Sequence, residues 1–93
     1  MIVMIKSAPD TPDGARGLTL AKDGGADIVL LQNGVSFIQK DSLGSFSGTV
    51  YVLDDDRKLR GLKDPGADPR MKTIDYDTLV DIMTGERKVV GMF

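Results

Sequence analysis

The stretch IVLLQNGVSF, residues 28–37, decides between two folds for this chain. Four apolar residues at 28–31 lead into Gln-Asn-Gly, and apolar residues then return. Asn-Gly between two apolar arms is the strongest short signal of a tight β-hairpin. A continuous apolar run favours instead a strand that is buried on both faces of a parallel sheet. The first arm does not alternate and the second alternates only in part, so the local pattern favours the buried strand and leaves the hairpin as an alternative.

Length and charge restrict the class of protein. With 93 residues the chain has room for one hydrophobic core, so we expect a single domain over residues 1–93. A net charge of −2 gives no general attraction to phosphate backbones, and we expect no direct binding of nucleic acid. The apolar start is interrupted at Lys6, which is too early for a signal peptide, and no run approaches the length of a membrane span. We therefore expect a soluble, cytoplasmic protein that does not bind membranes.

Cysteine and histidine are both absent from the sequence. Their absence excludes thiol nucleophiles, disulfides, zinc sites of the Cys/His type and acid–base chemistry based on histidine. The sequence also lacks a glycine-rich phosphate-binding fingerprint. Lysine, carboxylates, serine and tyrosine remain, but they form no recognisable catalytic arrangement. We expect a protein that is not an enzyme and that carries no cofactor or metal.

Short apolar runs predict strands, and they alternate with segments of helical pattern. The runs are residues 2–5, 28–31, 50–53, 71–74 and 88–93. Helical patterns occupy residues 12–24, 54–61 and 75–83, and a short helix or loop follows the second run. Such alternation indicates a parallel sheet with helices on both faces and right-handed crossovers. The sequence therefore predicts an α/β fold of three layers, α/β/α, around a five-stranded, mostly parallel sheet.

The first predicted helix combines an apolar face with two residues that disfavour helices. Ala15, Leu18 and Ala21 recur at helical spacing and are expected to face the core. Gly14 and Gly17 lower the intrinsic stability of the same segment. We therefore expect a helix that begins at a Thr-Pro pair, is weakened by its two glycines and ends at Gly24-Gly25.

The last predicted helix has a clearer pattern. Asp75 is a good N-cap, and an apolar face is formed by Tyr76, Leu79, Val80 and Met83 at i, i+3, i+4 and i+7. This spacing predicts a helix that packs on the sheet.

Polar residues follow several of the predicted strands, at the sheet edge where open α/β folds bind ligands. They are Gln32, Asn33 and Gly34 after the second strand, Asp54–Asp56 after the third, and Asp75 and Tyr76 after the fourth. Gln32 and Asn33 can hydrogen-bond a ligand or a partner's backbone. They also have a structural explanation, because asparagine tolerates a left-handed turn and glycine relieves steric conflict there.

The acidic triplet at residues 54–56 allows two interpretations. Hard cations prefer carboxylate oxygens, so three acids in a row indicate a magnesium or phospho-acceptor site. Acids in the first turn of a helix are also what the helix dipole favours, and a capped helix start needs no ligand. The sequence favours the helix start and leaves a small-ligand or Mg-dependent domain that uses Asp54–Asp56 as the alternative.

Three stretches in order resemble the DsrH/TusB family. They are LLQNGV at residues 30–35, VYVLDDDRKLRGL at residues 50–62 and IDYDTLVDIM at residues 74–83. Their spacing and the total length also agree with the family, and IKSAP at residues 5–9 is similar to its first strand. The resemblance implies the DsrE/F/H-like fold, in which the Gln-Asp-Gly-Val stretch leaves a buried strand and enters a helix. It therefore speaks against the hairpin.

The resemblance also implies a role in sulfur relay. TusB-like proteins assemble with two related subunits that pass persulfide sulfur towards 2-thiolation of the tRNA wobble uridine, and DsrH-like proteins serve an analogous complex in sulfur oxidation. The implied partners are DsrE- and DsrF-like (TusD- and TusC-like) subunits in a hetero-oligomer. The residues that we expect to contact a partner or ligand are Gln32, Asn33, Gly34, Asp54, Asp55, Arg60, Asp75 and Tyr76.

Sulfur-carrying relatives hold a cysteine just ahead of a helix that ends in Arg-Arg-Gly. Counting back from Arg60-Gly61 places Leu53 in that position, and leucine cannot form a persulfide. The resemblance therefore implies a non-catalytic subunit. A homo-oligomeric structural protein is a further alternative, and we expect the isolated chain to self-associate because a small parallel sheet leaves edges and apolar faces to cover.

Overall fold

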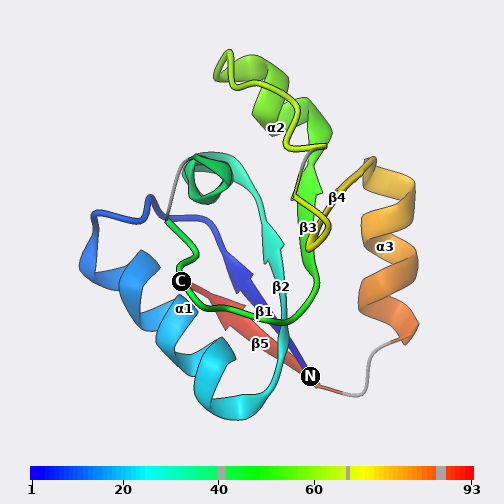
Figure 1. Ribbon diagram of the computed structural model, residues 1–93. Coiled ribbons are helices and arrows are strands. Elements are labelled where there is room, and N and C mark those ends of the chain that lie inside the picture. The colour runs from blue at the N-terminus through cyan, green and yellow to red at the C-terminus, as the bar shows by residue number, and fades with distance from the viewer. Residues whose placement is uncertain (40–41, 67, 86–87) are drawn as a thin grey trace.

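The computed structural model describes residues 1–39, 42–66, 68–85 and 88–93. Its elements alternate along the chain as the sequence predicts (Figure 1). In chain order they are β1 (Ile2–Ile5), α1 (Pro12–Gly24), β2 (Asp27–Leu30), the 3₁₀ helix η1 (Gln32–Ile38), β3 (Val50–Leu53), α2 (Asp54–Leu59), β4 (Met71–Ile74), α3 (Tyr76–Gly85) and β5 (Val89–Met92).

The five strands form one sheet in the order β4-β3-β2-β1-β5, and every pair of neighbours is parallel. The buried stretch that opened the sequence analysis is β2, with Ile28 in register with Val3 of β1 and Val50 of β3. Its three apolar side chains are fully buried. The hairpin alternative is therefore wrong, because β2 pairs on both sides with strands that run in its own direction, and the chain continues into η1.

Helices cover the two faces of the sheet unequally. Figure 1 shows α1 and η1 on one side and α3 on the other. The chain moves from β1 to β4 in one direction along the sheet and then crosses the whole sheet through α3 to reach β5. The remaining helix, α2, lies beyond the carboxyl end of β3 and contacts η1. The sequence predicted helices on both faces, and the structure assigns one of them to the end of the sheet.

Alternate residues of the strands supply two apolar clusters. The cluster under α1 and η1 is the larger, and its fully buried members include Val3, Ile5, Ile28, Leu30, Val50 and Val52. The cluster under α3 contains Ile2, Met4, Val29, Leu31, Leu53, Ile74 and Leu79. Successive side chains of a strand point to opposite faces of the sheet. A short strand of consecutive apolar residues therefore contributes side chains to both clusters.

The buried face of α1 differs from the predicted one. Gly14, Gly17 and Ala21 are buried, whereas Ala15 is exposed. A Cβ at Gly17 would come within 2.9 Å of the Ile5 side chain, and one at Gly14 would overlap a backbone carbonyl. Gly17 therefore allows α1 to lie close to β1, and Gly14 allows its first turn to lie against the loop that precedes it, which offsets the low helix propensity of both glycines.

The apolar face of α3 is also not the buried surface that the sequence predicted. Leu79 is 7% exposed, but Tyr76, Val80 and Met83 are 53%, 56% and 37% exposed. The helix therefore buries one of its four predicted core residues and presents the other three along an exposed flank. No helix in the described part of the chain is long and apolar enough to cross a membrane.

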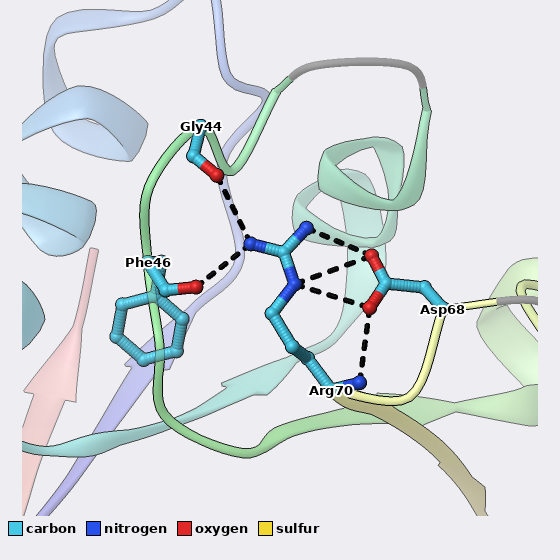
Figure 2. Close-up of polar contacts among 4 residues, drawn as sticks. All are labelled: Gly44, Phe46, Asp68 and Arg70. Carbon is cyan, nitrogen blue, oxygen red and sulfur yellow. Dashed lines mark hydrogen bonds and ion pairs between the residues drawn. The ribbon is translucent and has the colours of Figure 1, made fainter.

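At the amino end of the sheet, Arg70 joins the segment before β4 to the segment before β3 (Figure 2). Its guanidinium donates to both carboxylate oxygens of Asp68, at 2.8–3.3 Å, and to the carbonyls of Gly44 and Phe46, at 3.1 and 2.7 Å. Hydrogen bonding to Asp68 raises the pKa of Arg70 and lowers the pKa of Asp68. This contact fixes the two loops that start the outer half of the sheet.

Candidate functional site

The carboxyl edge of the sheet carries the polar residues that the sequence placed there. Because all strands are parallel, the segments that follow β1, β2, β3 and β4 meet at one edge. Two of them make direct side-chain contacts across the edge. They are the start of η1, after β2, and α2, after β3.

Asp56 is the centre of these contacts. It is the buried acidic residue of the described chain, with 8% of its surface exposed. Its Oδ2 accepts a hydrogen bond of 2.6 Å from the backbone N–H of Gln32. Gln32 has a φ of 51°, the left-handed region that side chains other than glycine adopt rarely. The carboxylate therefore holds the backbone of η1 at its first, unfavourable residue.

Arg60 connects the same two segments from the solvent side. Its Nε donates to Oδ1 of Asn33 at 3.2 Å, and its Nη1 donates to the carbonyl of Asp56 at 3.3 Å. The Arg60 guanidinium also lies 3.9 Å from the Asp56 carboxylate. Three predicted contact residues, Gln32, Asn33 and Arg60, are thus brought together around Asp56. We call these four residues the edge cluster.

Gly34 has a structural role beside this cluster. Its N–H donates to the carbonyls of Leu31 and Lys6, at 2.9 and 3.0 Å. A Cβ on Gly34 would overlap the carbonyl oxygen of Ile5. The segment can therefore pass the end of β1 only with glycine at this position, and this close approach accounts for Gly34 without a ligand.

Asp54 and Asp55 begin α2 but do not join the edge cluster. The Asp54 carboxylate pairs with Arg57 at 2.7 Å and with Lys58 at 3.1 Å. The hydrogen bond from Arg57 is the main reason that the pKa of Asp54 is lowered. Partial burial acts in the opposite direction and raises the pKa, and the hydrogen bond from Lys58 lowers it further. Asp55 is exposed. The first acid of the triplet therefore stabilises its own helix, as the dipole argument predicts.

Asp75 and Tyr76 begin α3. Asp75 accepts a hydrogen bond of 2.8 Å from the backbone N–H of Thr78, which is the N-cap contact that the sequence predicted. This bond lowers the pKa of Asp75. Tyr76 is exposed and starts the apolar flank with Val80 and Met83. Tyr76, Val80 and Met83 form a second exposed surface, which we call the α3 flank.

The described residues include no group of three or more acidic, histidine or cysteine side chains that could hold a metal ion. The carboxylates of Asp54 and Asp56 are directed to different partners, Arg57 and the Gln32 backbone. No observation here favours a magnesium site.

Comparison with known proteins assigns the family. Residues 7–89 match the family of DsrH-like proteins. The chain belongs to the DsrH-like family. The solution structure of protein Tm0979 from Thermotoga maritima is similar, with a TM-score of 0.63 and 26% identity over 98% of this chain and 100% of that one. A search among curated proteins found no significant match. DsrH-like proteins are sulfur-relay subunits that are generally non-catalytic and work with DsrE- and DsrF-like partners.

In this DsrH-like chain, the residue that the family resemblance places at the persulfide position, Leu53, is buried and is not a cysteine. Leu53 ends β3 immediately before α2, and it is 1% exposed. It packs in the cluster under α3 with Leu31, Ile74 and Leu79. A side chain at this position contributes to the core and is not accessible to another protein.

Asp56 is the residue of the site that the sequence analysis left out of its contact residues. It was present only as the third member of the acidic triplet. Its i, i+4 spacing to Arg60 was the one available signal, because such pairs lie on the same helix face. The sequence offered no sign of the contact to Gln32, which lies 24 residues away.

Proposed function

We propose that this chain is a non-catalytic subunit of a sulfur-relay assembly, in which cysteine-bearing DsrE- and DsrF-like (TusD- and TusC-like) chains carry the persulfide. The observation that carries the proposal is a DsrH-like chain without any cysteine. A thiolate is the group that accepts and passes persulfide sulfur, so this chain acts in the relay only by binding other subunits. The assembly serves either 2-thiolation of the tRNA wobble uridine or sulfur oxidation, in the cytoplasm.

The α3 flank supports binding through an exposed apolar surface. Tyr76, Val80 and Met83 lie along one helix at i, i+4 and i+7, with 37% to 56% of their surface exposed. A continuous apolar stripe on a small protein is typical of an interaction surface, whereas scattered apolar residues are not. Leu59 on α2, which is 80% exposed, is a further candidate contact. We propose that the α3 flank contacts a partner subunit, and that it supports self-association when the chain is isolated.

The proposal is tested by mixing the purified chain with DsrE- and DsrF-like subunits at micromolar concentration. We expect one complex in size-exclusion chromatography with light scattering. Val80→Asp places a charge in the middle of the flank and should weaken the complex, whereas Thr19→Asp on the exposed side of α1 should leave it intact. Purified chains that never co-elute would contradict the proposed role.

A second measurement addresses the non-catalytic role. A DsrE-like subunit loaded with persulfide is incubated with this chain, and both are analysed by intact mass spectrometry. We expect sulfur to leave the loaded subunit only when a cysteine-bearing acceptor is present, and this chain to keep its mass. Covalent sulfur on this chain would contradict the proposal.

A further inference from the structure

The Asn33-Gly34 pair, read first as a turn signal, also has a chemical property of its own. In an Asn-Gly sequence the backbone nitrogen of glycine can attack the side-chain carbonyl carbon of asparagine, because glycine has no Cβ to obstruct the approach. A bond forms between the Gly34 nitrogen and Asn33 Cγ, the bond from Cγ to the amide nitrogen breaks, and ammonia leaves with the proton from Gly34. Water then opens the resulting succinimide to aspartate or isoaspartate. The reaction requires no oxidant, reductant or enzyme.

The exposure of Asn33 makes this site accessible to water, and its contacts oppose the reaction. Asn33 is exposed at the carboxyl edge of the sheet. The attacking nitrogen must lose its proton and turn towards Cγ, but the Gly34 N–H donates to both Leu31 and Lys6, at 2.9 and 3.0 Å. The electrophilic group is also held in place, because Oδ1 of Asn33 accepts from Arg60 Nε at 3.2 Å. Both reacting groups are therefore fixed by hydrogen bonds from different parts of the fold.

The products of the reaction would fit this fold differently. Isoaspartate adds a methylene to the backbone at the point where Gly34 passes the Ile5 carbonyl without room for a Cβ. Aspartate leaves the backbone unchanged and places a carboxylate where Asn33 Oδ1 now meets Arg60. A carboxylate is the stronger acceptor, so it would compete with Asp56 for the same guanidinium.

We propose that Asn33-Gly34 is a latent deamidation site: folded η1, with Arg60 holding the Asn33 side chain, keeps the amide intact, and local opening of η1 releases the Gly34 nitrogen to attack Asn33 Cγ. The modification would act on the edge cluster by replacing the neutral partner of Arg60 with an anion. It is independent of the proposed role in sulfur relay, because it needs no partner subunit and no sulfur chemistry.

The test is a time course at mildly alkaline pH, with the purified protein either folded or unfolded in urea. Peptide mapping by mass spectrometry follows the replacement of the Asn33 amide NH₂ by a hydroxyl and separates aspartate from isoaspartate. We expect deamidation in the folded protein to be about tenfold slower or more than in the unfolded chain, because reaction then requires local opening. Equal rates would overturn the protection by η1, and an unreactive Asn33 in the unfolded chain would overturn the site itself.

Arg60→Ala tests the second half of the proposal in the folded protein. Loss of one hydrogen bond from Asn33 should accelerate deamidation between about twofold and about tenfold, the range that one net hydrogen bond supports. Arg16→Ala is the matched control, because it removes an exposed arginine of α1 that pairs only with Asp13 among its described contacts. An Arg60→Ala rate equal to that of the Arg16→Ala control would overturn the role of Arg60. Slow hydrogen exchange at the Gly34 amide, measured by NMR, gives an independent check on the protected state.

Discussion

The carboxylate of Asp56 accepts a 2.6 Å hydrogen bond from the backbone N–H of Gln32, 24 residues earlier in the chain. The bond joins the start of α2 to the start of η1, which follow neighbouring strands of the sheet. Gln32 has positive φ, a conformation that persists only where the surrounding structure determines it. Together with the hydrogen bonds of Gly34 and Arg60, this contact therefore holds the start of η1 and the position of Asn33.

Removal of the Asp56 carboxylate should destabilise the protein. Asp56→Ala leaves the Gln32 N–H without its acceptor, and we expect a loss of about 1–3 kcal/mol in the free energy of unfolding, measured by urea denaturation. Asp56→Asn should lose less, because its amide oxygen can still accept. The matched control is Asp55→Ala at the exposed neighbouring position, which should change stability by less than about 0.5 kcal/mol. Equal effects of the two alanine variants would show that the contact to Gln32 is not stabilising.

Gly34→Ala should be strongly destabilising. The added Cβ meets the backbone carbonyl of Ile5 in β1, an inner strand paired with β2 and β5, which cannot move without breaking the sheet. We expect a loss of about 3 kcal/mol in the free energy of unfolding, at the upper end of overpacking effects. Gly85→Ala, at the end of α3 with open space around the new Cβ, should be neutral or slightly stabilising. Thermal denaturation of the two variants distinguishes these outcomes.

A cysteine placed at Leu53 should be unreactive in the folded protein. Leu53 is 1% exposed within the cluster under α3, so Leu53→Cys would give a thiol that reagents reach only on unfolding. Leu59→Cys, six residues later and 80% exposed, provides the matched reactive position. Thiol labelling with and without urea measures both rates. Rapid labelling of the folded Leu53→Cys variant would show that this position is open to partners, contrary to the proposed function.

The Arg70 contact should contribute more to stability than an exposed ion pair. Arg70→Ala removes hydrogen bonds to Asp68 and to two backbone carbonyls, and we expect a loss of about 1–2 kcal/mol. Arg70→Lys should recover only part of this, because lysine lacks the planar fork that serves several acceptors at once. Arg16→Ala on α1 breaks an exposed pair and should cost about 0.5 kcal/mol or less. Denaturation curves of the three variants in one buffer provide the comparison.

Stability should fall in acid because of three carboxylates whose pKa values are lowered in the folded state. They are Asp54, beside Arg57; Asp68, beside Arg70; and Asp75, which caps α3. The unfolded chain binds these protons near the ordinary pKa of 3.8, and the folded chain binds them only at lower pH. Their contribution is therefore complete above about pH 5 and is lost progressively as pH falls through 3.8 and the folded values.

The measurement is the free energy of unfolding in urea between neutral pH and pH 3. Asp68→Asn should flatten the acid limb of this profile, since one of the three linked groups is removed. A profile for Asp68→Asn that is parallel to the wild-type curve would contradict the contribution of the pair with Arg70.

The order and type of the elements were predictable because each depends on neighbours in the sequence. Apolar runs without alternation indicate strands buried on both faces, and the Asp75 cap and the Thr-Pro pair indicate the starts of helices. The helix faces were less predictable. Periodicity selected Ala15 for the core of α1 although the glycines are buried, and it selected Val80 of α3 although the valine is 56% exposed. Periodicity shows which residues share a face, but the distance between a helix and its sheet depends on residues elsewhere in the chain.

The candidate site was predictable to the level of its segments. Parallel strands place the residues that follow them at one edge, so Gln32, Asn33 and the acids at residues 54–56 were expected near one another, whereas Arg60 was a contact candidate only through the family resemblance. Which acid of the triplet turns inward depends on the angle at which α2 leaves β3, and local sequence does not encode that angle. Asp54 and Asp55 were therefore selected in place of Asp56, the residue that makes the contact.

The sequence alone determined that this chain is an α/β protein and that it carries no thiol, because apolar patterning is local and composition does not depend on folding. Tertiary structure alone decided three further properties: the direct contact of Asp56 with Gln32, the burial of Leu53, and the exposure of the α3 flank. Each of these depends on distances between segments that are far apart in the chain. Those distances are set by the packing of the helices on the sheet.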